Sequence, residues 1–401
     1  MTDMSIDEIT GAGPHYEPYG WHQWPEFPWM SYQFRRSLGE VQGGGGAVSE
    51  VFQAASRMLP GDEESWYVEW TRVAERNRLR AESAEAAGHV LTARDAWLRA
   101  TDYYRSAEFW LTPDDQRRLQ TFTQCENSFT SASKYFPSPA EVVRVPYENG
   151  TFLPAYFLRA PGAPQGPQPM LIAFGGIDSF KEELYFMVAR GLLERGISCL
   201  LVDGPGQGGA LRRQGLLSRF DYEVPVGACV DYLLARGDID PARIAVSGSS
   251  LGGYYAARAG SKEHRLAATI SHGAIWDLSA MWKDLDEDFG LATHIKWVLG
   301  VPSMAAAREQ ADAFSLEGVL DEMQCPYLIV HGGHDVLGVQ QATQAAAYAR
   351  SVGVQVAFHL VDQEQTGAEH CQHDNPTLGM ELIGDWLTDL FEIDQSNVSA
   401  P

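Results

Sequence analysis

The chain has 401 residues, of which 45% are hydrophobic and 21% are charged, so it can bury a full core and is neither a disordered segment nor a small disulfide scaffold. At about 150 residues per domain, this length indicates two domains or one enlarged domain. The formal net charge of −23 repels nucleic-acid phosphates and anionic lipid headgroups. We therefore expect neither nucleic acid nor a membrane as a partner.

Cysteine usage and the start of the chain bear on the compartment. The five cysteines are scattered without a CxxC pair, which argues against a disulfide framework and against a zinc ribbon. The first ten residues are acidic where a secretory signal is basic, and no apolar run reaches the roughly 18 residues of a membrane span. The sequence thus predicts a soluble, cytoplasmic protein.

Residues 1–137 are predicted to form an N-terminal domain with an aromatic arm and a helical part. The segment from His15 to Trp29 is rich in aromatics and prolines, which favours an extended arm over a helix. Residues 49–132 carry apolar side chains at helical spacing, which predicts several amphipathic helices. The four glycines at 43–46 read as a turn. The aromatic cluster is either ordinary packing, the wall of a substrate pocket or a dimer interface.

Residues 138–395 show a different pattern. Two strand-like runs flank Asn149-Gly150, which predicts a hairpin. Short apolar strands then alternate with helical stretches, which predicts right-handed βαβ units and a mainly parallel sheet covered on both faces. These strands are expected at 170–174, 198–202, 244–247, 267–271, 327–330 and 354–361. Residues 275–320 interrupt the alternation and are predicted to form a cap-like helical insertion.

The sharpest motif is Gly248-Ser249-Ser250-Leu251-Gly252, a G-x-S-x-G sequence. It follows a predicted strand and precedes a predicted helix, and in that context the small residues permit a strained turn that projects the serine hydroxyl above the sheet. We therefore expect Ser250 to be a nucleophile. The alternative is an ordinary glycine-rich strand-to-helix turn.

A serine nucleophile needs a base that is oriented by a carboxylate, and in this architecture the acid precedes the histidine in the chain. Asp335 follows the apolar strand 327–330 and is the expected acid; otherwise it is a solvated or helix-capping residue. His370 and His373 both follow the last strand and compete for the role of base. His370 is preferred because it is nearer the strand end.

An oxyanion formed by attack on a carbonyl needs backbone amide donors. The first is expected from Leu251, which follows the nucleophile, and the second from the loop after strand 170–174, at Gly176 or Ile177.

Two other patterns carry little weight. The stretch 204–209 satisfies G-x-G-x-x-G, but it contains a proline and no regular helix start follows, so we expect no dinucleotide. His331, His334 and Asp335 lack a further ligand at a suitable spacing, so we expect no metal and no other cofactor.

Taken together, these motifs resemble the α/β-hydrolase fold, and specifically the subgroup of 2,6-dihydroxypseudooxynicotine hydrolase and the fungal hydrolases that shorten polyketides in melanin pathways. The resemblance covers most of the chain. It is carried by FGGIDSFKEELYF (174–186), LVDGPGQG (201–208), SGSSLGGYYAAR (247–258), CPYLIVHGGHDV (325–336) and EHCQHDNP (369–376), and upstream by 52–70 and 92–111.

The resemblance implies that His370, the first histidine of the H-C-x-H segment, is the base. It also implies a helical N-terminal region that helps to close the active site and forms a homodimer. An additional acidic residue near the substrate is implied after strand 267–271, where the chain offers Asp277, Asp284, Asp286 and Glu287. In that region His272, Trp276, Trp282 and Glu287 are candidates for substrate binding, although His272 could equally be a satisfied buried histidine.

The expected function is that of a cofactor-independent serine hydrolase that cleaves a C–C bond beside a ketone in an aromatic or polyketide-like small molecule. An esterase, a lactonase or an acyl-transferring cyclase would use the same residues. A non-catalytic protein with a vestigial site is the alternative from another class.

Overall fold

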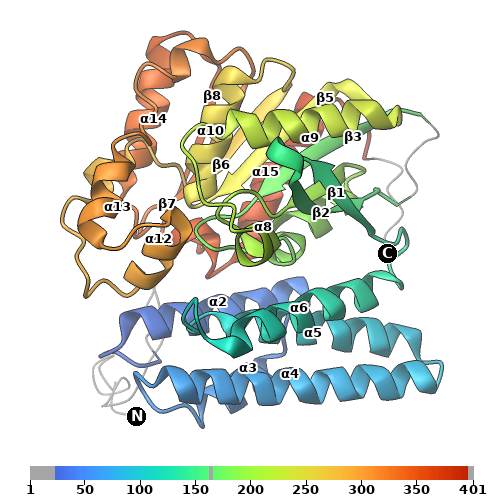
Figure 1. Cartoon of the computed structure of the whole chain (residues 1–401). Coiled ribbons are helices and arrows are strands. Elements are labelled where there is room, and N and C mark those ends of the chain that lie inside the picture. The colour runs from blue at the N-terminus through green and yellow to red at the C-terminus, as the bar shows by residue number, and fades with distance from the viewer. Residues whose placement is uncertain (1–22, 162–165, 396–401) are drawn as a thin grey trace, which may run out of the picture.

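The computed structural model describes residues 23–161 and 166–395. A layer of helices lies below a sheet-containing part in the view of Figure 1. This layer contains α2 (Pro28–Gly43), α3 (Val48–Ala55), α4 (Glu63–Ala86), α5 (Val90–Glu108) and α6 (Gln116–Ser133). Asp62 and Asp115 cap α4 and α6 by accepting backbone N–H groups, which accounts for where these helices begin. The helices predicted over 49–132 are therefore present.

Helix α2 was not predicted. Part of the expected extended arm, residues 15–22, lies outside the described residues, but Pro28 and Trp29 form the first turn of α2. Proline at this position lacks only an N–H that the helix would leave unbonded, so it starts the helix and does not break it. The arm prediction is wrong from Pro28 onward.

The upper part is built around one eight-stranded sheet with the order β1-β2-β4-β3-β5-β6-β7-β8. β1 and β2 pair antiparallel as the predicted hairpin, β2 pairs antiparallel with β4, and all other pairs are parallel. The strands are β1 (Glu141–Pro146), β2 (Phe152–Leu158), β3 (Gln168–Phe174), β4 (Ser198–Val202), β5 (Ile239–Ser249), β6 (Ala268–His272), β7 (Tyr327–Gly332) and β8 (Val356–Val361).

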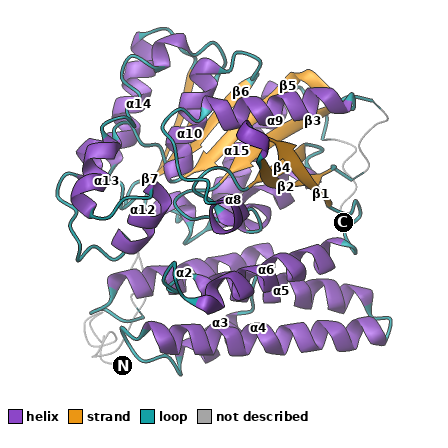
Figure 2. Ribbon diagram, in the orientation of Figure 1, coloured by secondary structure: helices purple, strands orange, loops and turns teal. Residues whose placement is uncertain are grey.

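In the central strands β3, β4, β5 and β7, successive apolar side chains enter two different hydrophobic cores, as a strand buried on both faces requires. In β3, Leu171 and Ala173 pack with the N-terminal helices, while Met170 and Ile172 pack on the opposite face. Figure 2 shows helices on both sides of the sheet. They are a π-helical turn η2 (Tyr185–Ala189), α7 (Arg190–Glu194), α8 (Gly208–Gln214), α9 (Glu223–Arg236), α10 (Leu251–Lys262), α14 (Val339–Ser351) and α15 (Pro376–Leu390).

Residues 275–320, between β6 and β7, hold α11 (Leu278–Trp282), α12 (Ala292–Leu299) and α13 (Met304–Ala311), followed by the short turn η3 (Leu320–Glu322). This segment contacts the helical layer, since the Trp29 and Phe289 rings lie 5.0 Å apart between centroids. The predicted fold class, an α/β-hydrolase sheet with an N-terminal helical region and a helical insertion, is confirmed. Within residues 23–161 and 166–395, no helix is long and apolar enough to cross a membrane.

Candidate active site

Ser250 occupies a sharp turn between the end of β5 and the start of α10. Its φ of 59° and ψ of −123° are rare for a residue with a side chain, and its N–H donates to the His272 carbonyl at 2.9 Å. The turn is tight enough that a Cβ on Gly248 would lie 1.8 Å from the Gly252 carbonyl oxygen, so only glycine fits there. The half-buried Ser250 hydroxyl makes no hydrogen bond to a described residue. It is therefore held in strained geometry and left available to react.

Asp335 and His370 form a buried pair. Asp335 follows β7, and His370 begins the short turn η4 (His370–Gln372) after β8, the neighbouring parallel strand. His370 Nδ1 lies 2.8 Å from Asp335 Oδ1, and Asp335 also accepts the Leu337 N–H at 2.8 Å. A carboxylate at Nδ1 leaves Nε2 free to take a proton. His373, the competing candidate, packs its ring 6.0 Å from Tyr32 and is not bonded to Asp335.

The Ser250 turn and the His370 ring meet at Gly273, the residue after β6. A Cβ on Gly273 would lie 3.5 Å from both the Ser250 nitrogen and His370 Cε1. His370 Nε2 contacts Cys371 Sγ at 3.6 Å, and that thiol donates to the His272 carbonyl at 3.2 Å. The carboxyl ends of β5, β6, β7 and β8 thus bring together residues that are far apart in the chain.

Asp335 and His370 each shift the pKa of the other toward the charged form. Burial alone lowers the pKa of His370, but the Asp335 carboxylate, with smaller contributions from Cys371 and Tyr32, raises it well above its ordinary value. Burial has the opposite effect on Asp335 and raises its pKa, but the His370 ring outweighs burial, so the pKa of Asp335 is lowered. Burial and the charge of Arg36 instead lower the pKa of His373 well below its ordinary value. Of the two candidate histidines, only His370 therefore has a raised pKa.

Two backbone amides without a hydrogen-bond partner among the described residues lie in segments next to Ser250. Leu251 is the first residue of α10, where the N–H has no partner within the helix. In the loop after β3, the Gly176 N–H donates to Ser179 Oγ at 2.9 Å, whereas the Ile177 N–H makes no hydrogen bond within the part of the chain that the structure describes. Gly176 itself lies against Ser250, because a Cβ there would be 2.7 Å from Ser250 Cβ. Of the two predicted donors, Ile177 is the free one.

His272 is close to the site but is already satisfied. Its Nε2 lies 2.5 Å from Gln372 Oε1, and its carbonyl accepts from the Ser250 N–H. Burial lowers its pKa to about 4, so the ring is neutral at pH 7. These contacts favour the structural role over the predicted substrate contact.

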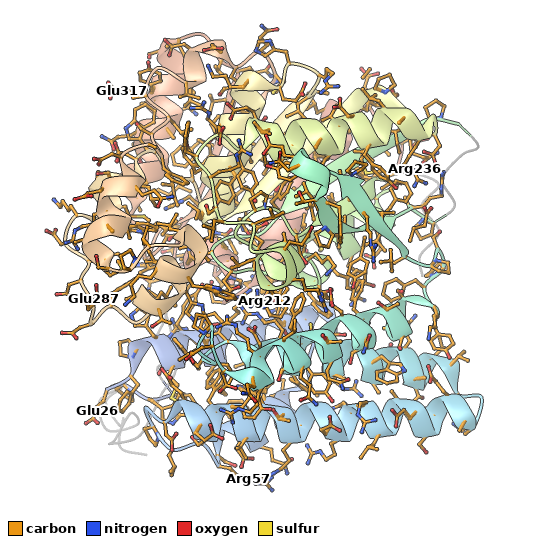
Figure 3. The ribbon with its side chains drawn as sticks, viewed as in Figure 1. Glu26, Arg57, Arg212, Arg236, Glu287 and Glu317 are labelled. Atoms are coloured by element: carbon orange, nitrogen blue, oxygen red, sulfur yellow. The ribbon has the colours of Figure 1, made fainter. Side chains whose placement is uncertain are left out.

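Two of the predicted substrate-binding residues in the insertion have partners within the insertion and its core. Trp282 is 3% exposed and belongs to the core between the insertion and the sheet. Glu287 lies on the outer edge of the insertion in Figure 3, where it pairs with Lys296 at 2.6 Å. The insertion thus packs Trp282 inward and turns Glu287 to solvent, and a substrate contact of either residue stays a prediction.

The remaining candidates of the insertion also have local roles. The Trp276 ring packs 4.9 Å from that of Tyr348, and its backbone N–H donates to Gln341. Asp277 caps α11, while Asp284 and Asp286 are exposed. None of these acids contacts Ser250 or His370, and the implied acidic residue near the substrate stays a prediction.

Helix α2 supplies contacts that the sequence did not predict. The Tyr32 ring lies 6.5 Å from the His370 ring, and Arg35 pairs at 2.9 Å with Glu369, the residue before the histidine. Trp29 and Tyr32 are three residues apart and share one helix face, with centroids 6.2 Å apart. This spacing after Pro28 was the signal that could have revealed the helix. The described residues contain no group of three His, Cys, Asp or Glu side chains that could hold a metal ion.

Comparisons with known proteins agree with this geometry. Residues 179–392 match the model of the prolyl oligopeptidase family. The chain is 32% identical to "Hydrolase ORFZ" of Pyricularia oryzae, over 79% of this chain and 84% of that protein. It is 33% identical to "20-hydroxy-prefusarin hydrolase FUS2" of Gibberella moniliformis, over 75% and 81%.

Among solved structures, the chain is similar to 2,6-dihydroxy-pseudo-oxynicotine hydrolase, with a TM-score of 0.75, 30% identity, and coverage of 91% of this chain and 98% of that chain. The resemblance stated from the sequence is therefore confirmed. The chain belongs to the prolyl oligopeptidase family of α/β-hydrolases and is an enzyme of the serine hydrolase class.

Proposed function

We propose that this protein hydrolyses a C–C bond beside a ketone in an aromatic or polyketide-like small molecule, with Ser250, His370 and Asp335 as its catalytic triad. The observation that carries the proposal is that the Ser250 turn and the ring of the buried His370–Asp335 pair both lie beside Gly273, while the Ser250 hydroxyl has no hydrogen bond to a described residue. The resemblance to the pseudo-oxynicotine hydrolase supports the ketone substrate, since that similarity spans nearly the whole of both chains.

The aromatic rings near the site favour a flat, apolar substrate. Trp29, Tyr32 and His370 form a continuous series of ring contacts from the N-terminal helices to the base. A cavity beside Trp29 opens between the helical layer and the insertion. Its lining residues include Phe27, Trp29, Trp110 and Gly290. Trp29 is common to this cavity and to the series of rings that ends at His370.

The reaction proceeds by covalent catalysis. Ser250 Oγ attacks the ketone carbon while its proton passes to His370 Nε2, and the oxyanion accepts hydrogen bonds from the Leu251 and Ile177 amides. Collapse breaks the C–C bond, and His370 protonates the leaving carbon, which a second carbonyl stabilises as an enolate. Water then gives its proton to His370 and attacks the acyl-enzyme, releasing a carboxylic acid and returning the proton to Ser250.

The test compares an aryl β-diketone with an aryl ester in ¹⁸O-labelled water, using the wild type and Ser250→Ala. We expect the wild type to convert the diketone to a methyl ketone and a carboxylic acid with one ¹⁸O atom in the acid. Ser250→Ala should convert neither compound. Rapid ester hydrolysis without any diketone cleavage would replace this proposal with an esterase or lactonase.

A further inference from the structure

We propose that Asp178 is a positioning residue for the oxyanion-binding loop, held by a buried ionic cluster that reaches into the N-terminal helices and the insertion. The cluster is defined as Asp178, Glu108, Arg118, Arg212 and His294. This inference rests on the proposed function, because it assigns the Ile177 amide to the oxyanion.

Asp178 directly follows Ile177 and is fixed by three partners. Its Oδ1 lies 2.6 Å from Arg212 Nη1, and its Oδ2 lies 2.7 Å from Arg118 Nη2 and 3.2 Å from His294 Nδ1. Asp178 is only 3% exposed. Ionic contacts at these lengths in a desolvated site fix orientation strongly, and removal of one partner leaves an uncompensated buried charge.

Glu108 completes the charge balance. It holds Arg212 through two bonds, 2.7 Å at Nε and 2.9 Å at Nη2, and pairs with Arg118 Nε at 2.8 Å. Two carboxylates therefore face two guanidinium groups. The Arg118 guanidinium also lies 4.0 Å from the Trp297 ring of the insertion. The two negative and two positive charges balance, so the cluster is neutral without a bound ion.

The cluster joins the loop after β3 to four helices from three regions of the chain. Glu108 belongs to α5, Arg118 to α6, Arg212 to α8 and His294 to α12 of the insertion. Figure 3 shows Arg212 at the junction between the sheet-containing part and the helical layer. The loop after β3 is thus anchored to the elements that cover the substrate.

The backbone of this loop needs such an anchor. Asp178 has a φ of 51°, and a residue with a side chain keeps this conformation only where its surroundings enforce it. On the other side of Ile177, the Gly176 N–H is bonded to Ser179, and Gln207 Nε2 donates to the Gly175 carbonyl at 2.5 Å. The Ile177 amide is therefore the unbonded group between two fixed residues. Loss of the Asp178 anchor should loosen this amide.

The test uses the full chain with Asp178→Asn, because asparagine keeps the shape but presents an N–H₂ group to one arginine. The control is Glu126→Gln: Glu126 also joins α6 to the sheet-containing part, through Lys181 at 2.9 Å and Arg213 at 2.5 Å, but makes no contact with the cluster. We measure kcat and KM for the aryl β-diketone, and the affinity for an aryl trifluoromethyl ketone. The adduct of this ketone with Ser250 places an oxyanion on the Leu251 and Ile177 amides.

For Asp178→Asn we expect kcat to fall by about 10- to 100-fold, a fraction of what deleting one oxyanion donor costs. The trifluoromethyl ketone affinity should fall in parallel, KM should stay within about threefold, and Glu126→Gln should behave as wild type. A folded Asp178→Asn with unchanged kcat and unchanged ketone affinity overturns the inference. So does an equal loss in Glu126→Gln.

If Asp178→Asn does not fold, His294→Phe decides, because it removes the 3.2 Å contact with Asp178 and keeps an aromatic ring against Phe109. A kcat reduced about threefold or more, with a matching loss of ketone affinity, supports the inference, and unchanged values overturn it. Labelling of wild-type Ser250 by a fluorophosphonate separates failure of this inference from failure of the proposed function. If Ser250 is labelled but the cluster variants keep wild-type kinetics, only this inference is rejected. If Ser250 is not labelled, the proposed function is rejected.

Discussion

His370 Nδ1 lies 2.8 Å from Asp335 Oδ1, although 35 residues separate the two in the chain. They meet because β7 and β8 are neighbouring parallel strands whose carboxyl ends lie at the same edge of the sheet. The second Asp335 oxygen lies 3.7 Å from His331 Nε2, so the carboxylate stands between two imidazoles. This position favours the ionised aspartate that a catalytic imidazolium needs.

The first prediction is that Asp335→Asn lowers kcat by about 10⁴-fold while the protein remains folded. Asparagine can fill the space, but it favours the wrong imidazole tautomer and gives no charge to stabilise the imidazolium. Steady-state kinetics and circular dichroism check this prediction. A folded variant that retains more than a tenth of wild-type kcat would contradict the role of Asp335.

The second prediction concerns the pH profile of kcat/KM. His370 acts as a base only when neutral. Burial lowers its pKa in the free enzyme, but the Asp335 carboxylate outweighs burial and raises the pKa above its ordinary value of about 6.5. Activity should therefore rise with pH along a limb whose midpoint lies above 6.5. In the residual activity of Asp335→Asn the midpoint should move to lower pH. A wild-type midpoint below 6 would contradict this account.

The third prediction is that Gly176→Ala lowers kcat by about 10²- to 10³-fold, the range seen when an oxyanion contact is lost. The added methyl group would lie 2.7 Å from Ser250 Cβ and 3.1 Å from Oγ, so the nucleophile and the amide loop must move apart. Gly150→Ala is a matched control, since a Cβ there meets nothing within 4 Å, although its φ of 77° strains the turn. Equal activity in Gly176→Ala and wild type would show that the loop does not approach Ser250.

The fourth prediction is that Glu40→Gln stabilises the protein at pH 8 but not at pH 4. Glu40 and Asp102 are buried near each other under Gly45, and each has one oxygen without a hydrogen bond. Burial raises the pKa of both carboxyls, and the charge of Asp102 raises that of Glu40 further.

The sign follows from proton linkage. In the unfolded chain both carboxyls ionise near pH 4, but the folded protein holds a proton more tightly, so stability is greatest below that pH and falls as the pH rises. Because glutamine does not ionise, Glu40→Gln avoids this loss, and its free energy of unfolding should be higher than that of the wild type by roughly 1 to 3 kcal/mol at pH 8. Urea denaturation at both pH values measures it, with exposed Glu317→Gln as control. A stabilisation that is the same at pH 4 and pH 8 would contradict the linkage.

Much of the sheet could be predicted from the sequence because its signals are local. Buried strands such as 198–202 coincide with the observed β4, and the G-x-S-x-G motif lies at the predicted strand-to-helix turn. Asp335 and His370 could be chosen because each lies in the segment after a predicted strand, and the topology of a parallel sheet brings strand ends together.

The parts that could not be predicted depend on contacts across the chain. Asp178 meets Arg118 and His294 at sequence separations of 60 and 116 residues, and no local pattern pairs them. The insertion was predicted as helical, but the direction in which it turns Trp282 and Glu287 depends on its packing against the sheet. Helix α2 was missed because its first residues belong to a segment rich in aromatics and prolines, which favoured an extended arm. Its Tyr32 ring lies 6.5 Å from the His370 ring.

The most direct test of the central claim is the site of covalent modification by a fluorophosphonate, mapped by mass spectrometry of the intact protein and its peptides. We expect one adduct per chain, on Ser250, with loss of hydrolysis in proportion to labelling and no adduct on Ser250→Ala. An adduct on another residue that accounts for the lost activity, or full turnover by Ser250→Ala, would contradict the account.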